Sequence, residues 1–259
     1  MAKYITECKL NYFESKKAGK IAIVTMDNGQ MYNIPNTWGV EAFESLNKVL
    51  DIVEKDKDVK GWMLTGKPFI FNVGADIMSV DPNATKKDVL DIGVMGHTSF
   101  KRIMDLKIPT LAAINGATMG GGCEVGLYHD YRTISKSPGG CDHYALPECF
   151  LGLVPGWGGT QLVTKLAGPE KAIDLIIMNP LNQNKMINSI KAFEMGLADF
   201  LLAPNDFTGQ SLAILEGIIT GEVKVDRKKV DPKMSDDLYN QTKFQILGRV
   251  HSGAIAPYK

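Results

Sequence analysis

Two glutamates, Glu124 and Glu148, are the side chains of this sequence best suited to chemistry. Each stands in apolar sequence, and a carboxylate is rarely fully buried without a partner. Burial raises the pKa of a carboxyl group toward the range useful for proton transfer near neutral pH. Two such groups beside one small cavity can hold a water molecule between them, so we interpret them as a candidate acid and base. Taken alone, Glu148 fits an acid at a helix end better than a catalytic group.

Two glycine-rich turns are the second candidate feature. Three consecutive glycines, at residues 120–122, precede Glu124, and a Gly74-Ala75-Asp76 turn follows an earlier strand-like run. Glycine is costly unless the backbone adopts positive φ or closely approaches another group. N–H groups at a strand-to-helix junction are unpaired and lie at the positive end of the helix dipole, so two such turns can stabilise an oxyanion. The alternatives are tight packing for the triplet and a helix cap for Asp76.

Composition argues against several other functions. The 29 basic and 29 acidic residues give a formal net charge of zero, which is not typical of nucleic-acid or membrane-surface binding. The triplet lacks the G-x-G-x-x-G spacing of a dinucleotide site. No apolar run approaches the roughly 20 residues that span a bilayer, and the charged N-terminus does not fit a signal peptide. Four scattered histidines and four cysteines without a C-x-x-C pair predict no metal site, and reduced thiols in a cytoplasmic protein.

Hydrophobic periodicity predicts an α/β protein. Apolar and β-branched runs predict strands at residues 20–26, 60–65, 110–115 and 131–135. Apolar residues three and four positions apart predict helices at residues 37–55, 89–106, 161–167, 169–178, 189–194, 208–220 and 235–250. The polar residues 79–88 are expected to form a mobile surface loop. Because strand–helix repeats give way to helices alone, we expect a core at residues 1–203 and a C-terminal helical region at 204–259.

Four sequence segments together resemble the crotonase (enoyl-CoA hydratase/isomerase) superfamily. In chain order they are FNVGADI, IPTLAAINGATMGGGCE, ALPECFLGLVPGWGGTQ and KAFEMGLAD. They cover most of residues 21–199, and their combination is highly specific. Within the family, the chain is most similar to the N-terminal hydratase module of multifunctional fatty-acid oxidation proteins. The resemblance implies a ClpP/crotonase-like fold, which is a spiral of ββα units with a C-terminal helical region.

The resemblance also implies a role for each residue that matches the family's motifs. The two oxyanion-hole N–H groups fall on Ala75 and Gly121, and the two catalytic glutamates fall on Glu124 and Glu148. Gly156 matches the position whose N–H helps to hold the water. The other two glycines of the triplet are expected to let the backbone and a thioester approach closely.

Coenzyme A is the ligand that the resemblance implies, as part of the substrate, with no separate cofactor and no metal. Its adenine is expected against the loop that contains Asn72, Val73, Ala75 and Ile77. The acyl-CoA thioester is the expected small-molecule partner. For assembly, the resemblance leaves open a homo-oligomer or a fusion to a 3-hydroxyacyl-CoA dehydrogenase.

The implied activity is that of an enoyl-CoA hydratase in fatty-acid β-oxidation. Water adds syn across the C2–C3 double bond of a trans-2-enoyl-CoA to give a 3-hydroxyacyl-CoA. Glu148 is expected to supply the proton to C2, and Glu124 is expected to act as the base toward water. The alternatives are a Δ3,Δ2-enoyl-CoA isomerase that uses mainly Glu148, and a non-catalytic acyl-CoA-binding module of a larger oxidation complex.

Overall fold

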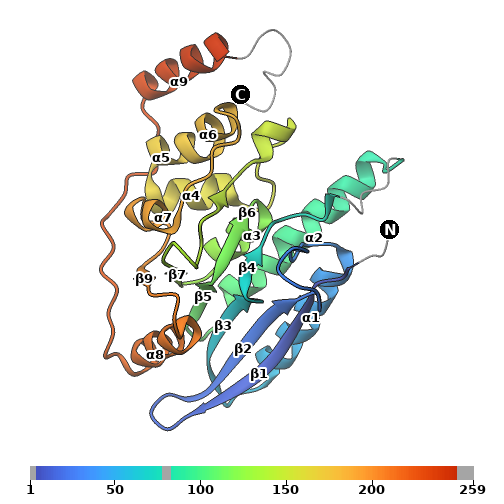
Figure 1. Ribbon diagram of the computed structural model, residues 1–259, viewed down its shortest axis with the longest axis vertical. Helices are drawn as coiled ribbons and strands as arrows, with labels where there is room; N and C mark the ends of the chain where they lie inside the picture. The colour runs from blue at the N-terminus through green and yellow to red at the C-terminus, as the bar shows by residue number, and fades with distance from the viewer. Residues whose placement is uncertain (1–3, 78–82, 250–259) are drawn as a thin grey trace.

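A computed structural model describes residues 4–77 and 83–249, and its larger sheet has six strands in the order β1-β2-β3-β5-β7-β9 (Figure 1). These strands are β1 (Glu7–Ser15), β2 (Gly19–Asp27), β3 (Val59–Gly66), β5 (Thr110–Ile114), β7 (Tyr131–Ser135) and β9 (Phe200–Leu202). Strands β1 and β2 form an antiparallel hairpin, and the other neighbouring pairs are parallel. The four predicted strands are β2, β3, β5 and β7, so those predictions are confirmed.

Among the described residues, a smaller sheet contains three strands, which come directly after β3, β5 and β7 in the chain. Its parallel strands are β4 (Phe69–Asn72), β6 (Gly116–Met119) and β8 (Tyr144–Ala145). Three successive ββα units result: β3 and β4 with α2 (Lys86–Asp105), β5 and β6 with α3 (Gly121–Leu127), and β7 and β8 with a 3-10 helix, η2 (Glu148–Leu151). The expected ββα architecture is therefore confirmed. Because β4, β6 and β8 are parallel, the segments that follow them leave the sheet at one edge.

Helices cover both faces of the larger sheet. Successive side chains of a strand point to opposite faces, and on β5 both sets are apolar. On β5, Leu111 and Ala113 belong to the apolar cluster that contains residues of α8 (Phe207–Thr220). Ala112 and Ile114 belong instead to the main core, together with residues of α1 (Val40–Lys55) and α2. Figure 1 shows α8 on one side of the sheet and α1 with α2 on the other.

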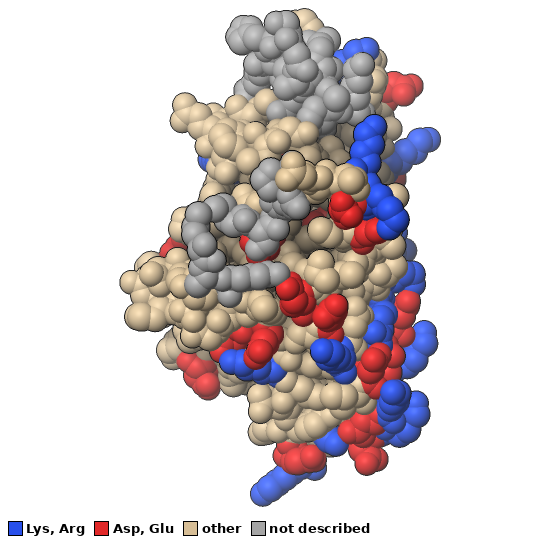
Figure 2. Space-filling model, turned by 90° about the vertical axis from the view of Figure 1, so that its right-hand side faces the viewer, with Lys and Arg blue, Asp and Glu red and all other residues tan. Residues whose placement is uncertain are grey.

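Helices and helical turns make up most of the chain after residue 158. They are α4 (Gly159–Ala167), α5 (Pro169–Ile173), a π-helical turn (Asp174–Met178), α6 (Asn179–Leu181), α7 (Ser189–Glu194), α8 and α9 (Asp236–Arg249). The helices predicted there form within about two residues of their expected ends. None of the helices in the described part of the chain is long and apolar enough to cross a membrane. On the face shown in Figure 2, acidic and basic side chains are interspersed.

Two helices begin elsewhere than predicted, for identifiable reasons. Helix α1 begins at Val40 because Trp38 pairs with the first glycine turn, where its N–H donates to the Gly74 carbonyl at 2.7 Å. Helix α2 already begins at Lys86, because Thr85 and Asp88 cap it reciprocally. Residues 86–88 of the predicted surface loop are therefore helical, and residues 79–82 of that loop lie outside the described residues.

Candidate active site

The two glycine turns predicted to bind an oxyanion meet at the edge of the smaller sheet. Gly74 follows β4 with φ of +92°, and Gly120 follows β6 with φ of +50°. Both values fall where side chains with a Cβ are strained. A Cβ on Gly74 would lie only 3.0 Å from the backbone nitrogen of Gly121, so the turns are in direct contact.

Two backbone N–H groups are available at this contact, those of Ala75 and Gly121. Trp38 pairs with the Gly74 carbonyl and the Asp76 N–H, on either side of Ala75, and leaves the N–H of Ala75 out of the pairing. Gly121 begins α3, where an N–H has no acceptor within the helix. Within residues 4–77 and 83–249, neither N–H has a hydrogen-bond acceptor. The arrangement suits an oxygen that develops negative charge, and the predicted roles stay predictions.

The glycine triplet combines three separate requirements. Gly120 supplies the positive φ. A Cβ on Gly121 would lie 2.3 Å from the ring of Trp157, and a Cβ on Gly122 would lie 1.9 Å from the carbonyl oxygen of Asn72. The close approach at Gly122 is therefore to the backbone at the end of β4, and the expected approach of a thioester to the triplet stays a prediction.

Glu124 is 1% exposed and lies in the first turn of α3. One of its oxygens, Oε1, accepts hydrogen bonds from the N–H groups of Trp157 and Gly159, both at 2.8 Å. Burial raises the pKa of Glu124 from 4.5 to about 7, although the two N–H donors oppose the shift. The residue is thus an anchored carboxyl group that can exchange a proton near neutral pH.

Glu148 begins η2, close to the end of β8, and its carboxyl group lies against the glycine triplet. A Cβ on Gly120 would lie 2.8 Å from its Oε1. Its other oxygen, Oε2, is buried and has no hydrogen-bond partner among the described residues. Burial, and then the charge of Glu124, raise the pKa of Glu148 to about 8. Because buried polar atoms are normally hydrogen-bonded, Oε2 is suited to accept a hydrogen bond from a ligand or a water molecule.

Trp157 and Gly159 contribute to the site in a way that the side-chain pattern did not indicate. The ring of Trp157 packs at 5.2 Å from Phe43, as a packing residue would, but its backbone N–H binds Glu124. Gly156 has no hydrogen bond to Glu124 in the described structure, and its predicted role in positioning water stays a prediction. The glycine-rich start of α4 is the sequence feature that could have indicated these backbone donors.

The four predicted contacts for coenzyme A differ in accessibility. Asn72 is fully buried, and its side-chain oxygen accepts a bond from the Gly74 N–H at 2.8 Å. Its side chain therefore supports the turn, and in this conformation it is not available to adenine. Val73 is half-buried, whereas Ala75 and Ile77 are exposed. All four residues stay predictions as ligand contacts.

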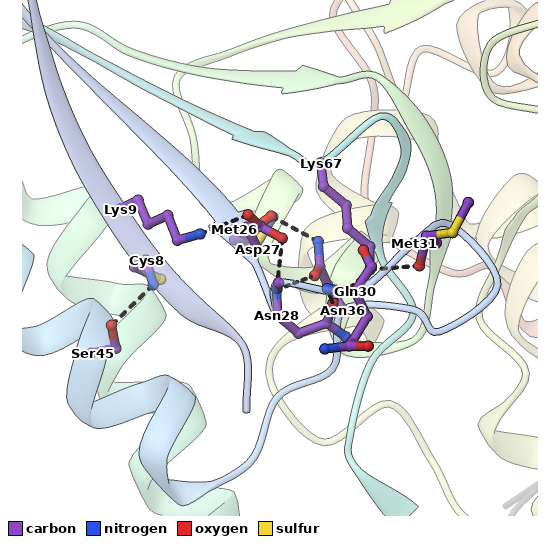
Figure 3. A network of polar contacts seen from close by, with 11 residues as sticks. Cys8, Lys9, Met26, Asp27, Asn28, Gln30, Met31, Asn36, Ser45 and Lys67 are labelled. Carbon is purple, nitrogen blue, oxygen red and sulfur yellow. Dashed lines mark hydrogen bonds and ion pairs between the residues drawn. The ribbon is translucent and has the colours of Figure 1, made fainter. Parts of the chain in front are cut away.

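A buried lysine, Lys67, holds the loop of residues 28–34 (Figure 3). Its ammonium group contacts four oxygens of the 28–34 loop: Asn28 Oδ1 at 2.6 Å and the carbonyls of Gln30, Met31 and Ile34 at 2.9, 3.0 and 2.5 Å. Asn28 also donates from its N–H to Asn36 Oδ1, and the Asn36 carbonyl accepts the N–H of Val73. A hydrogen-bonded chain thus connects Lys67 with the segment that carries Ala75.

We expect Lys67→Met to destabilise the protein by about 1–3 kcal/mol, because it removes the four hydrogen bonds through which the ammonium group holds the 28–34 loop. Urea unfolding measures this change, and Lys48→Met, at an exposed site on α1, is the matched control with an effect below about 0.5 kcal/mol. Equal unfolding midpoints for Lys67→Met and Lys48→Met would show that the buried ammonium does not hold the loop.

The two raised pKa values predict how stability depends on pH. In the folded state Glu124 and Glu148 keep protons that the unfolded chain releases above about pH 4.5. Their contribution is therefore complete below that pH and is lost as pH rises through about 7 and 8. Between about pH 5 and pH 8, the free energy of unfolding should fall by several kcal/mol more in the wild type than in the double variant Glu124→Gln/Glu148→Gln. Parallel pH dependences of the two proteins in urea unfolding would contradict the raised pKa values.

Comparison with known sequences identifies relatives over most of the chain. The sequence pattern of the enoyl-CoA hydratase/isomerase family matches residues 16–248. The short-chain-enoyl-CoA hydratase of Clostridium acetobutylicum is 29% identical over 243 residues, which cover 92% of this chain and 87% of that protein. The fatty acid oxidation complex subunit alpha of Psychrobacter arcticus is 29% identical over 222 residues. Those residues cover 82% of this chain and 30% of the relative, so the chain spans less than a third of that relative's length.

Solved structures share the fold. DspI of Pseudomonas aeruginosa superposes with a TM-score of 0.69 at 27% identity, covering 82% of this chain and 74% of the other. An enoyl-CoA hydratase from Bacillus anthracis gives 0.68 at 22% identity, covering 93% and 90%. The human mitochondrial delta3-delta2-enoyl-CoA isomerase gives 0.68 at 19% identity, covering 93% and 83%. The last two likenesses establish the fold alone.

Proposed function

The chain belongs to the enoyl-CoA hydratase/isomerase family, and from that premise we propose that it hydrates trans-2-enoyl-CoA to 3-hydroxyacyl-CoA. The observation that carries the proposal is the pair of buried glutamates beside two unpaired N–H groups. Glu124 and Glu148 have pKa values raised to about 7 and about 8, and these values suit a base and an acid. A single acidic group would suffice for moving a double bond, whereas adding water also requires a group that binds and deprotonates it.

The oxyanion donors act first in the proposed mechanism. The thioester carbonyl oxygen accepts hydrogen bonds from the N–H groups of Ala75 and Gly121. As negative charge develops on that oxygen, both bonds strengthen, and each donor is expected to contribute about 10²–10³ in rate. The partial positive charge at the start of α3 acts in the same direction.

The glutamates then move the protons. Deprotonated Glu124 removes a proton from water as the water oxygen forms a bond to C3, and the C2–C3 π electrons move onto the thioester as an enolate. The enolate re-forms the carbonyl as C2 takes a proton from protonated Glu148. Atoms and charge balance, since the substrate gains one water while Glu124 gains a proton and Glu148 loses one. The higher pKa of Glu148 agrees with its role as donor.

The relatives' names support the substrate class. One is a short-chain-enoyl-CoA hydratase, and another is a subunit of a fatty acid oxidation complex. We therefore place the proposed reaction in fatty-acid β-oxidation, with an acyl-CoA substrate. An adjoining or associated 3-hydroxyacyl-CoA dehydrogenase is the partner that would consume the product.

A direct hydration assay tests the function. Purified protein should remove the enoyl-thioester absorbance of crotonyl-CoA or of a longer trans-2-enoyl-CoA, and 3-hydroxyacyl-CoA should accumulate. Conversion of a 3-enoyl-CoA to the 2-enoyl isomer without hydration would support the isomerase instead. Tight binding of these thioesters without turnover at any chain length would support the non-catalytic binding module.

A further inference from the structure

A cavity open to solvent lies away from the glutamates, near the amino-terminal ends of β5 and β7. Its volume is about 650 Å³, within the range of small-molecule sites. It is lined by the end of α2, the Lys107–Pro109 linker, the turn after α3, the second half of α4 and the 225–227 segment. The candidate active site instead follows the carboxyl ends of β4, β6 and β8, so the two sites occupy different ends of the strands.

Apolar side chains form part of the walls of this cavity. Leu106 and Ile108 line it from the α2 side, Leu162 and Leu166 from α4, and Val225 from the C-terminal segment. These four leucine and isoleucine side chains are half-buried, which leaves part of their surface for another apolar group, whereas Leu127, which also lines the cavity, is buried. A ligand with an apolar body therefore fits the walls.

The charges at the cavity are predominantly positive. Lys107, Lys165, Arg132 and Arg227 line it, against a single lining carboxylate, Asp130. In the described structure the two lysines are exposed and have no acidic partner. Asp130 already accepts the N–H and the hydroxyl of Thr110 through Oδ2, both at 3.0 Å. The lysine charges are thus not neutralised by the protein groups around them.

The two arginines share one buried acid behind the cavity. Asp199 accepts Arg227 Nε at 2.6 Å and Arg132 Nη2 at 3.3 Å. One carboxylate therefore faces two guanidinium groups. Arg132 is 1% exposed, and its Nε is buried without an acceptor among the described residues. An anion in the cavity would offset this excess of positive charge.

We propose that this cavity binds a small amphiphilic anion. A carboxylate or phosphate head group pairs with Lys107 and Lys165, and an apolar tail lies against Leu162 and Leu166. Charge-assisted bonds to the lysines supply selectivity for the anion, and contact with the leucines supplies selectivity for the tail. The proposal does not depend on the hydratase reaction, because none of these residues belongs to the catalytic machinery.

Isothermal titration calorimetry with matched probes tests the site. Octanoate and octyl phosphate carry both parts of the ligand and distinguish the two head groups. Acetate and inorganic phosphate carry the head alone, and 1-octanol carries the tail without charge. We expect octanoate or octyl phosphate to bind at least about tenfold more tightly than any of the three partial probes. Binding of 1-octanol as tight as that of octanoate, or no binding of either full probe, would overturn the proposal.

Variants locate the binding. Lys107→Gln/Lys165→Gln should weaken binding of the full probes about tenfold or more, whereas Lys48→Gln, an exposed lysine on α1, should leave it unchanged. Circular dichroism and the unfolding midpoint verify that the variants fold. Equal affinities of the double variant and the wild type would overturn the assignment. Loss of binding in the presence of saturating crotonyl-CoA would place the probe at the glutamates and overturn it as well.

Discussion

Replacing either Glu124 or Glu148 by glutamine is expected to lower kcat for enoyl-CoA hydration by about 10²–10⁴, the usual contribution of a positioned acid or base. Glutamine keeps nearly the same shape but cannot exchange a proton. Removing either group should therefore stop the reaction at the step it serves, with smaller changes in KM. Steady-state kinetics on crotonyl-CoA measures both parameters.

The exposed acid Glu170, on α5, supplies the control for this pair. Glu170→Gln changes the same chemical group on the surface and should keep the wild-type kcat. The combination of the two catalytic changes should cost little more than either alone, since the groups act in one reaction. Wild-type rates in both single variants would exclude the proposed mechanism.

Gly121→Ala is expected to lower kcat by about 10²–10³ and to destabilise the protein by about 1–3 kcal/mol. The added Cβ would lie 2.3 Å from the ring of Trp157, so the helix start or the ring must move. Movement of the helix start displaces one oxyanion donor, and movement of Trp157 displaces an N–H that holds Glu124. Kinetics and urea unfolding measure the two effects separately.

Gly93→Ala is the matched control, because Gly93 lies inside α2 and a Cβ there would have no atom within 4 Å. Alanine is a better helix former than glycine, so this change should stabilise the protein by about 0.5–1 kcal/mol and leave kcat unchanged. A Gly121→Ala protein with the kcat of the wild type would show that the rate depends on the position of neither the Gly121 N–H nor the Trp157 N–H.

The sequence predicted the parts of this fold that have long, periodic patterns. Apolar and β-branched runs such as residues 20–26 identified four of the six strands of the larger sheet and missed β1 and β9, and three- and four-residue spacings identified the helices. Strands β6 and β8 have four and two residues, too few for an alternating pattern to be recognised. Their position nevertheless decides where the glycine triplet and Glu148 meet, so residue pattern alone could suggest the site but not assemble it.

Side-chain type identified the two glutamates, but it identified neither the groups that bind Glu124 nor the buried state of Lys67. Glu124 and Glu148 were identifiable because acids in apolar sequence are unusual. The donors to Glu124 are backbone N–H groups at residues 157 and 159, which any amino acid other than proline could supply. Lys67 is 5% exposed, contrary to the usual preference of lysine for the surface, and nothing in its immediate sequence indicates this. The cavity near Lys165 needs Val225, which is 60 residues away in the chain, so only the tertiary structure reveals it.

The two bonds to Glu124 end on the same oxygen, and this has a consequence for the handedness of the product. With Oε1 held by two donors, the carboxyl group cannot rotate freely, and Oε2 is the atom left to orient a water molecule. An alkene is planar and presents two mirror-related faces, but a base fixed in this way reaches only one of them. With the thioester also held by the two oxyanion donors, the proposed reaction would deliver oxygen to a single face of C3, and we expect the product to be one enantiomer of the alcohol.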